Sequence, residues 1–171
     1  MKLSFLLKGF PGHPLHPPLT DATIGAYTAA AAFAVLGKLG ISEHNMATAW
    51  WLALIVGLAV TVPTALAGFA DWMDISRETP LWRTATAHML AMLTATAFFL
   101  LAAGTGHGGY SDGDVNGSGL VLTLVGWIVL TVGGWLGGSI VFVHGMRVLN
   151  LLDEPARRAV TPGGEEKERA E

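Results

Sequence analysis

The sequence of 171 residues contains no cysteine. This absence excludes disulfides, thiolate metal sites and iron–sulfur clusters held by this chain. Charged residues are also scarce, because Asp, Glu, Lys and Arg make up 13% of the residues whereas hydrophobic residues make up 51%. With a mean hydropathy of +0.49, this composition is wrong for a soluble domain and predicts a membrane protein. The net charge of -3 gives no indication of a nucleic-acid partner.

Recognisable catalytic patterns are absent as well. The sequence has no nucleophile beside an obvious base and no glycine loop that opens a helix as a phosphate-binding site. The carboxylates Asp71 and Asp74 lie where an apolar segment ends, which is typical of solvated charges. Four short spans with no evident internal repeat also give little support to alternating-access transport. We therefore expect no independent catalytic activity.

Four segments are long and apolar enough to cross a bilayer, which requires about 20 helical residues. They cover residues 20–39, 47–70, 81–103 and 120–149. The sequence therefore predicts an all-α fold, an integral membrane bundle of four transmembrane helices. It forms a single domain over 1–152, followed by a polar, disordered tail over 153–171. We expect Thr20 or Asp21 to cap the first helix, and Gly104–Gly119 to be a solvated loop.

Positive charges are distributed unequally between the two sides of the predicted bundle. Four spans place both termini, and the loop between spans two and three, on one side of the membrane. That side carries Lys2, Lys8, Arg77, Arg83, Arg147, Arg157, Arg158, Lys167 and Arg169. The other side carries only Lys38. By the positive-inside rule, both termini are predicted to be cytoplasmic.

Two histidines lie in a proline-rich stretch, Gly12–Pro18, that precedes the first span. Each is followed by a proline, which disfavours the α conformation in the preceding residue. We therefore expect His13 and His16 on extended or turn backbone, where a stiff loop holds their imidazoles at the cytoplasmic side.

The predicted topology brings two further histidines to the same side. His88 lies about one turn into span three, where its helical face continues through Met92 into an apolar stripe that is typical of a core. His144 is predicted near the end of span four, on one helical face with Gly133 and Gly137. Small residues at this spacing let another helix or a flat cofactor approach the backbone.

The remaining polar groups divide between the two sides. Asp71, at the end of span two, joins the cytoplasmic layer of histidines. His44 and His107 fall on the other side, where ordinary solvated side chains are expected.

Ionisable residues in membrane spans tend to face a bundle interior or a functional site. Two facing imidazoles suit the axial positions of a haem b, for which His88 and His144 are the predicted ligands and His13 and His16 supporting or alternative ones. A single Zn, Cu or Fe ion is the alternative cofactor, with these four histidines and Asp71 as candidate ligands. In a third interpretation the histidines only hydrogen-bond, no cofactor is bound, and the protein is a structural or anchoring subunit.

The chain resembles the bacterial four-helix membrane family of domain of unknown function 2231. The resemblance covers residues 12–148 and depends on these motifs: Gly12–Pro17, Thr20-Asp21, Ile24-Gly25, Ala67–Trp72, His88, Gly137-Gly138 and His144-Gly145. It implies a multi-pass protein of the bacterial cytoplasmic (inner) membrane whose biochemical role is unassigned. Many relatives have Asn at the position of Met92, and if that Asn orients a ligand the site is altered here.

Some relatives are similar to modules fused to Rieske or cytochrome-type domains, which implies a place in membrane electron transfer. Here a redox partner of that type is expected to be a separate polypeptide. Apart from the lipid bilayer, the other partner that we consider is a second copy of the chain in a homo-oligomer.

Overall fold

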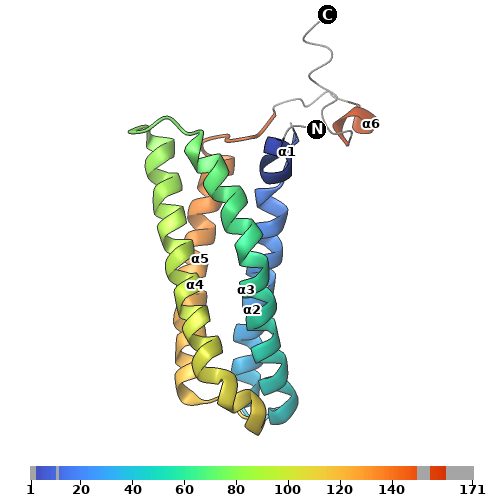
Figure 1. The fold of residues 1–171 in the computed structure, drawn as a ribbon, viewed down its shortest axis with the longest axis vertical. Helices are drawn as coiled ribbons and strands as arrows, with labels where there is room; N and C mark the ends of the chain where they lie inside the picture. The colour runs from blue at the N-terminus through green and yellow to red at the C-terminus, as the bar shows by residue number, and fades with distance from the viewer. Residues whose placement is uncertain (1–2, 11, 150–154, 161–171) are drawn as a thin grey trace, which may run out of the picture.

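A computed structural model describes residues 3–10, 12–149 and 155–160. Four long helices form an elongated bundle (Figure 1): α2 (His16–Lys38), α3 (Glu43–Met73), α4 (Pro80–Asp112) and α5 (Gly117–Phe142). The short elements are α1 (Leu3–Lys8), β1 (Gly9–Phe10), β2 (His13–Pro14) and α6 (Ala156–Ala159). Each long helix is sufficiently long and apolar to cross a membrane. The predicted all-α bundle of four membrane-spanning helices is therefore confirmed.

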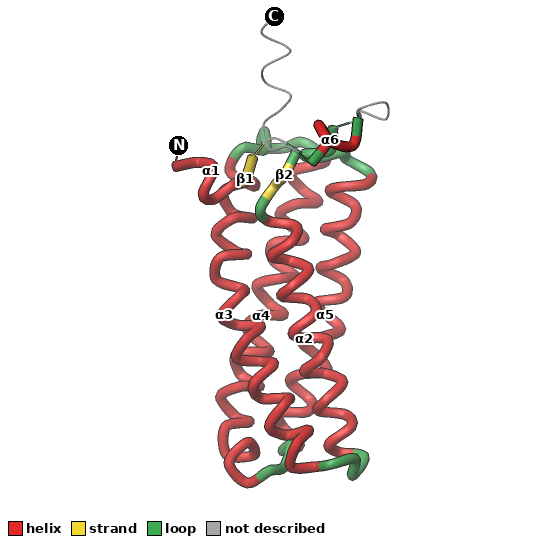
Figure 2. Tube along the Cα trace, turned by 90° about the vertical axis from the view of Figure 1, so that its right-hand side faces the viewer, coloured by secondary structure: helices red, strands yellow, loops and turns green. Residues whose placement is uncertain are grey.

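The bundle consists of two helical hairpins, α2–α3 and α4–α5, whose helices contact each other along their length. The hairpins meet where α3 packs on α4 and α2 packs on α5, so α2 and α4 lie on a diagonal. Both hairpins begin and end at the same end of the bundle, where α1 and the antiparallel β1–β2 pair also lie (Figure 2). We call this the histidine end, because it contains His13, His16, His88 and His144.

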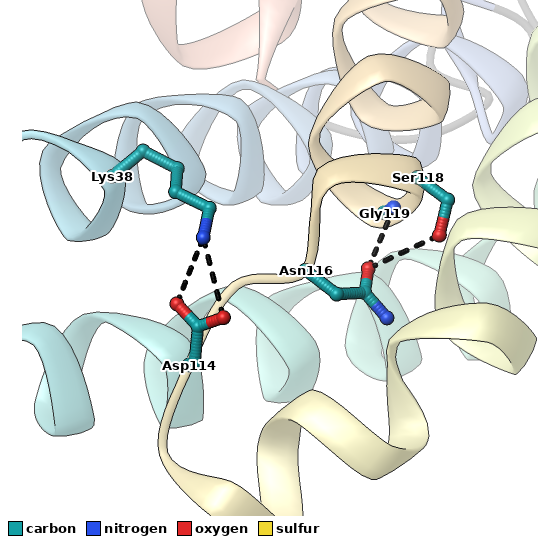
Figure 3. Close-up of polar contacts among 5 residues, drawn as sticks. All are labelled: Lys38, Asp114, Asn116, Ser118 and Gly119. Atoms are coloured by element: carbon teal, nitrogen blue, oxygen red, sulfur yellow. Dashed lines mark hydrogen bonds and ion pairs between the residues drawn. The ribbon is translucent and has the colours of Figure 1, made fainter.

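The opposite end is fastened by polar contacts in the short α4–α5 connection. The Asn116 side chain caps α5 by accepting a hydrogen bond of 2.7 Å from the Gly119 amide (Figure 3). Lys38, at the end of α2, donates to the Asp114 carboxylate at 2.9 and 3.2 Å. The Lys38–Asp114 ion pair thus connects the ends of the two hairpins at the far side of the bundle.

The core is narrow because small residues bring the helices together. Ala30, Ala34 and Ala102 are fully buried, and larger rings fill the remaining space. Tyr27 and Phe99 stack face to face between the hairpins, with ring centroids 3.8 Å apart. Many other large apolar side chains, such as Leu66 and Trp135, are exposed on the outside. In a bilayer this outer surface contacts lipid chains.

The first helix begins earlier than we predicted. α2 starts at His16 with Leu15 as its N-cap, so neither Thr20 nor Asp21 has the capping role. His16 is therefore helical, contrary to the prediction, whereas His13 lies on extended backbone as predicted. Pro17 and Pro18 occupy the first turn, where a missing N–H costs no hydrogen bond.

The predicted solvated loop over Gly104–Gly119 is wrong. α4 continues to Asp112, and only residues 113–116 separate it from α5. Packing explains the difference, because the Trp50 ring from α3 occupies the space that a side chain at Gly106 would need. Gly106 therefore serves helix packing and not chain flexibility.

The fourth span is shorter than predicted, since α5 ends at Phe142 instead of residue 149. Gly145 and Arg147 have positive φ angles of 66° and 59°, which a right-handed helix does not accommodate. The ends of the four spans agree with the predicted topology, while the cytoplasmic assignment of the histidine end stays a prediction. Of the predicted tail, residues 155–160 are described and include α6; the rest lies outside the described residues.

The close contact between Gly57 and Tyr27 generates a prediction about helix packing. A Cβ at Gly57 would lie 2.5 Å from the Tyr27 ring, so Gly57→Ala should lower the free energy of unfolding by about 1–3 kcal/mol. Gly25 has no atom within 4 Å of its Cβ position, so Gly25→Ala should be neutral or stabilise by up to about 1 kcal/mol. Thermal unfolding in detergent micelles measures both; equal effects would contradict this account of the core.

Candidate functional site

His16 is held against α3 by its ring. Its Nδ1 lies 3.0 Å from the Thr64 carbonyl oxygen. A carbonyl oxygen can only accept, so Nδ1 carries the hydrogen and Nε2 of the neutral ring keeps its lone pair. A Cβ at Gly68 would lie 2.6 Å from the His16 ring, so this glycine makes room for the imidazole. His16 is therefore fixed in position and tautomer by one helical turn of α3.

His88 is held against α5 in the same way. Its Nδ1 donates to the Gly133 carbonyl oxygen at 2.8 Å, which again leaves Nε2 as an unprotonated acceptor. A Cβ at Gly137 would lie 3.1 Å from the His88 ring. Gly133 and Gly137, predicted as positions of close approach, thus both contact His88: Gly133 through its carbonyl group and Gly137 through the space it leaves. Met92, one turn further along α4, packs its sulfur against Gly133.

The two imidazoles lie next to each other across the bundle. The ring centroids of His16 and His88 are 6.3 Å apart, and the rings are nearly perpendicular, at 80°. They come from the diagonal helices α2 and α4, and both are half-buried. We predicted His88 and His144 as the facing pair, whereas the structure pairs His88 with His16. We call His16 and His88 the imidazole pair.

His144 and His13 lie apart from this pair in their contacts. The Nε2 of His144 is 3.1 Å from the Thr84 hydroxyl group of α4. Because α5 ends at Phe142, His144 does not follow the helical phase of Gly133 and Gly137 on which its predicted inward position depended. Nδ1 of His13 is buried without a hydrogen-bond partner among the described residues.

Asp71 is buried at the histidine end instead of solvated as expected. Its side chain forms an ion pair with Arg147 from the segment after α5, and the residue is only 7% exposed. It also interacts electrostatically with His16. Nearby, Lys8 of α1 donates to Asp74 at 2.6 Å. The two ion pairs attach α1 and the chain after α5 to the end of α3. The sequence did not predict the Asp71–Arg147 pair, because no spacing pattern relates residues so far apart in the chain.

The five residues proposed as ligands of a bare metal ion do not assemble into one set. Within residues 3–10, 12–149 and 155–160, no group of three or more His, Cys, Asp or Glu side chains is placed to hold a metal ion. Asp71 is instead paired with Arg147, and His144 with Thr84. The arrangement provides two oriented imidazole nitrogens.

The two histidines at the far end are exposed, as predicted. His107 lies within α4 and not in a loop, and it packs beside the ring of Trp51, with centroids 5.3 Å apart. Its place at the far end of α4 and its exposure make it a suitable control position for experiments on the imidazole pair.

The Asp71–Arg147 ion pair generates a stability prediction. Arg147→Ala leaves a buried carboxylate without its cation, and it should lower the free energy of unfolding by about 1–3 kcal/mol. Lys38→Ala removes the exposed Lys38–Asp114 pair and should cost about 0–1 kcal/mol. Thermal unfolding at low and high salt measures both effects. An Arg147→Ala variant no less stable than Lys38→Ala would contradict the structural role of this ion pair.

A family model described as "Predicted membrane protein (DUF2231)" matches residues 12–150. The matched range includes all four long helices, the imidazole pair and Arg147. No curated protein and no solved structure matches the chain significantly. The match covers most of the chain and agrees with the motifs from which the resemblance was predicted. The chain therefore belongs to the DUF2231 family of predicted membrane proteins.

Proposed function

We propose that the protein is a haem b module of membrane electron transfer in which His16 and His88 would hold the haem iron. The observation that carries this proposal is the hydrogen bonding of the pair. Each ring donates Nδ1–H to a backbone carbonyl group and keeps an unprotonated Nε2. Histidines that bind metals commonly donate their second ring nitrogen in this way, because the bond fixes the ring and raises the basicity of the ligating nitrogen.

The number of available ligands favours haem over a bare metal ion. Zinc sites in proteins use three or four protein ligands, whereas a haem brings four nitrogens and needs only one or two axial side chains. In the described part of the chain, the metal-binding side chains form no group of three. Two imidazoles from diagonal helices therefore suit the two faces of a haem better than they suit a bare metal ion.

The space beside the pair is filled by the protein itself. Gly68 and Gly137 lie on the two flanking helices at the level of the imidazoles, and the rings of His16 and His88 occupy the room that these glycines leave. A hollow of about 440 Å³ at this end is lined by Asp74, Ile75, Ser76, Thr79, Leu81 and Met146, and not by either ring. Insertion of a haem therefore has to widen the space between α2 and α4.

When bound, haem supplies one-electron chemistry; the chain supplies orientation and surroundings. The Thr64 and Gly133 carbonyl groups fix both rings, which are half-buried between the helices. The family resemblance favours a Rieske or cytochrome-type partner at the cytoplasmic face of a bacterial inner membrane. This assignment of side and partner is part of the proposal.

A structural function is the second candidate, and the same hydrogen bonds favour it. His16 joins α2 to α3, and His88 joins α4 to α5, so each ring holds one hairpin together. An unpaired polar group in a membrane span costs free energy, and these two bonds satisfy one nitrogen of each ring without any ligand. In this alternative the bundle anchors a partner at the membrane.

Haem binding by the pair is testable by spectroscopy. Wild-type protein purified in mild detergent from haem-replete cells should show a Soret band that shifts on reduction. His16→Ala and His88→Ala should each remove the six-coordinate spectrum, because each variant lacks one axial nitrogen. His107→Ala, at the far end, should leave it unchanged.

A colourless wild-type preparation would reject the haem proposal. Stoichiometric Zn, Cu or Fe without haem would favour the bare metal ion. Neither haem nor metal, combined with a lower thermal midpoint for both alanine variants and recovery of a defined complex in pull-down, would favour the structural function.

A further inference from the structure

Equivalent residues recur in α2 and α4 with a constant separation. His88 and Phe99 stand 72 residues after His16 and Tyr27, respectively. Each residue contacts its own counterpart: the two imidazoles lie 6.3 Å apart, and the rings of Tyr27 and Phe99 stack at 3.8 Å. Two helices whose matching residues contact each other at two levels are related by an axis that passes between those residues.

The returning helices α3 and α5 repeat with a separation of 69 residues. Thr64 and Gly133 supply the carbonyl groups that bind His16 and His88, and Gly68 and Gly137 follow four residues later beside the same rings. The match continues further along the bundle, where a Cβ at Gly57 would meet the Tyr27 ring and one at Gly126 the Phe99 ring.

Both hairpins also run in the same direction. α2 and α4 begin at the histidine end, and α3 and α5 return to it (Figures 1 and 2). The axis that relates the hairpins is therefore parallel to the bundle, as in membrane proteins built from parallel repeats. No repeat was evident in the sequence, since most equivalent positions differ in residue type; the matching ones include the histidines, some glycines, two alanine pairs and two valine pairs.

We propose that α2–α3 and α4–α5 are two copies of one hairpin, and that the imidazole pair is a two-fold site to which each copy supplies one ligand. The group that this pair would hold is a haem, whose iron would take one imidazole nitrogen from each copy. This assignment of ligand class rests on the proposed function. The duplication does not, because it depends on protein contacts alone.

The symmetry is broken on one side of the site. Thr20 lies one turn after His16, and the corresponding residue one turn after His88 is Met92. The Thr20 hydroxyl group lies 3.5 Å from Nε2 of His16. Asp71, which interacts with His16, corresponds to Ile140. The polar groups thus gather around His16, so the two faces of the site differ in their surroundings while each provides one imidazole.

The two-ligand site is tested by adding haemin alone to the full-length protein in detergent. We expect one haemin per chain with a low-spin, six-coordinate spectrum. His16→Ala and His88→Ala should lose this spectrum to the same extent, the double variant should lose no more, and free imidazole should restore it in either single variant. His13→Ala and His144→Ala should keep it. A six-coordinate spectrum that survives either single substitution in the pair, or that His13→Ala or His144→Ala removes, would overturn the site.

The duplication is tested separately by exchanging a hydrogen bond between the copies. The Tyr27 hydroxyl group lies 2.9 Å from that of Thr61, and the counterparts of these residues are Phe99 and Leu130. We expect the fourfold variant Tyr27→Phe, Thr61→Leu, Phe99→Tyr, Leu130→Thr to unfold within about 4 °C of the wild type. Phe99→Tyr alone, which places a phenol against Leu130, should unfold at a lower temperature than the fourfold variant.

A fourfold variant as unstable as Phe99→Tyr alone would reject the equivalence of the two hairpins. The two experiments fail independently. If haemin does not bind the wild type but the exchange is tolerated, the proposed function and its ligand class are wrong, and the duplication stands.

Discussion

Close packing of rings against glycine backbones sets the spacing of this bundle. Tyr27 and Phe99 lie against Gly57 and Gly126, respectively. Closer to the histidine end, the two imidazoles lie against Gly68 and Gly137. With lipid outside, apolar burial contributes little between membrane helices, so association depends on close contact and on hydrogen bonds. The same contacts that bring the hairpins together therefore decide which polar side chains meet.

The imidazole pair follows from this packing. A histidine near the end of a span needs a hydrogen-bond partner, and a helix at close range provides one through a backbone carbonyl group. Because each carbonyl oxygen can only accept, it selects the tautomer and leaves Nε2 available. Structural support and ligand binding thus use different nitrogens of the same ring, and the two candidate functions differ only in what Nε2 contacts.

Predictions from the sequence were most accurate where they depended on one segment at a time. Apolar length identified all four helices, and small-residue spacing identified Gly133 and Gly137 as sites of close approach. Errors arose where a distant segment decides the local structure. The glycines of Gly104–Gly119 predicted a loop, but Trp50 packs against Gly106 and α4 continues to Asp112. Helical periodicity predicted an inward-facing His144, but α5 ends two residues before it.

The sequence by itself determined that this chain is a four-span membrane bundle with its histidines concentrated at one end, because hydropathy and chain direction are properties of the order of residues. Only the tertiary structure decided that His88 faces His16 and not His144 and that Asp71 pairs with Arg147, and only its contacts support the proposed equivalence of the two hairpins. These facts depend on how helices rotate and approach one another, and that geometry is set by contacts between residues about 45 to 75 positions apart.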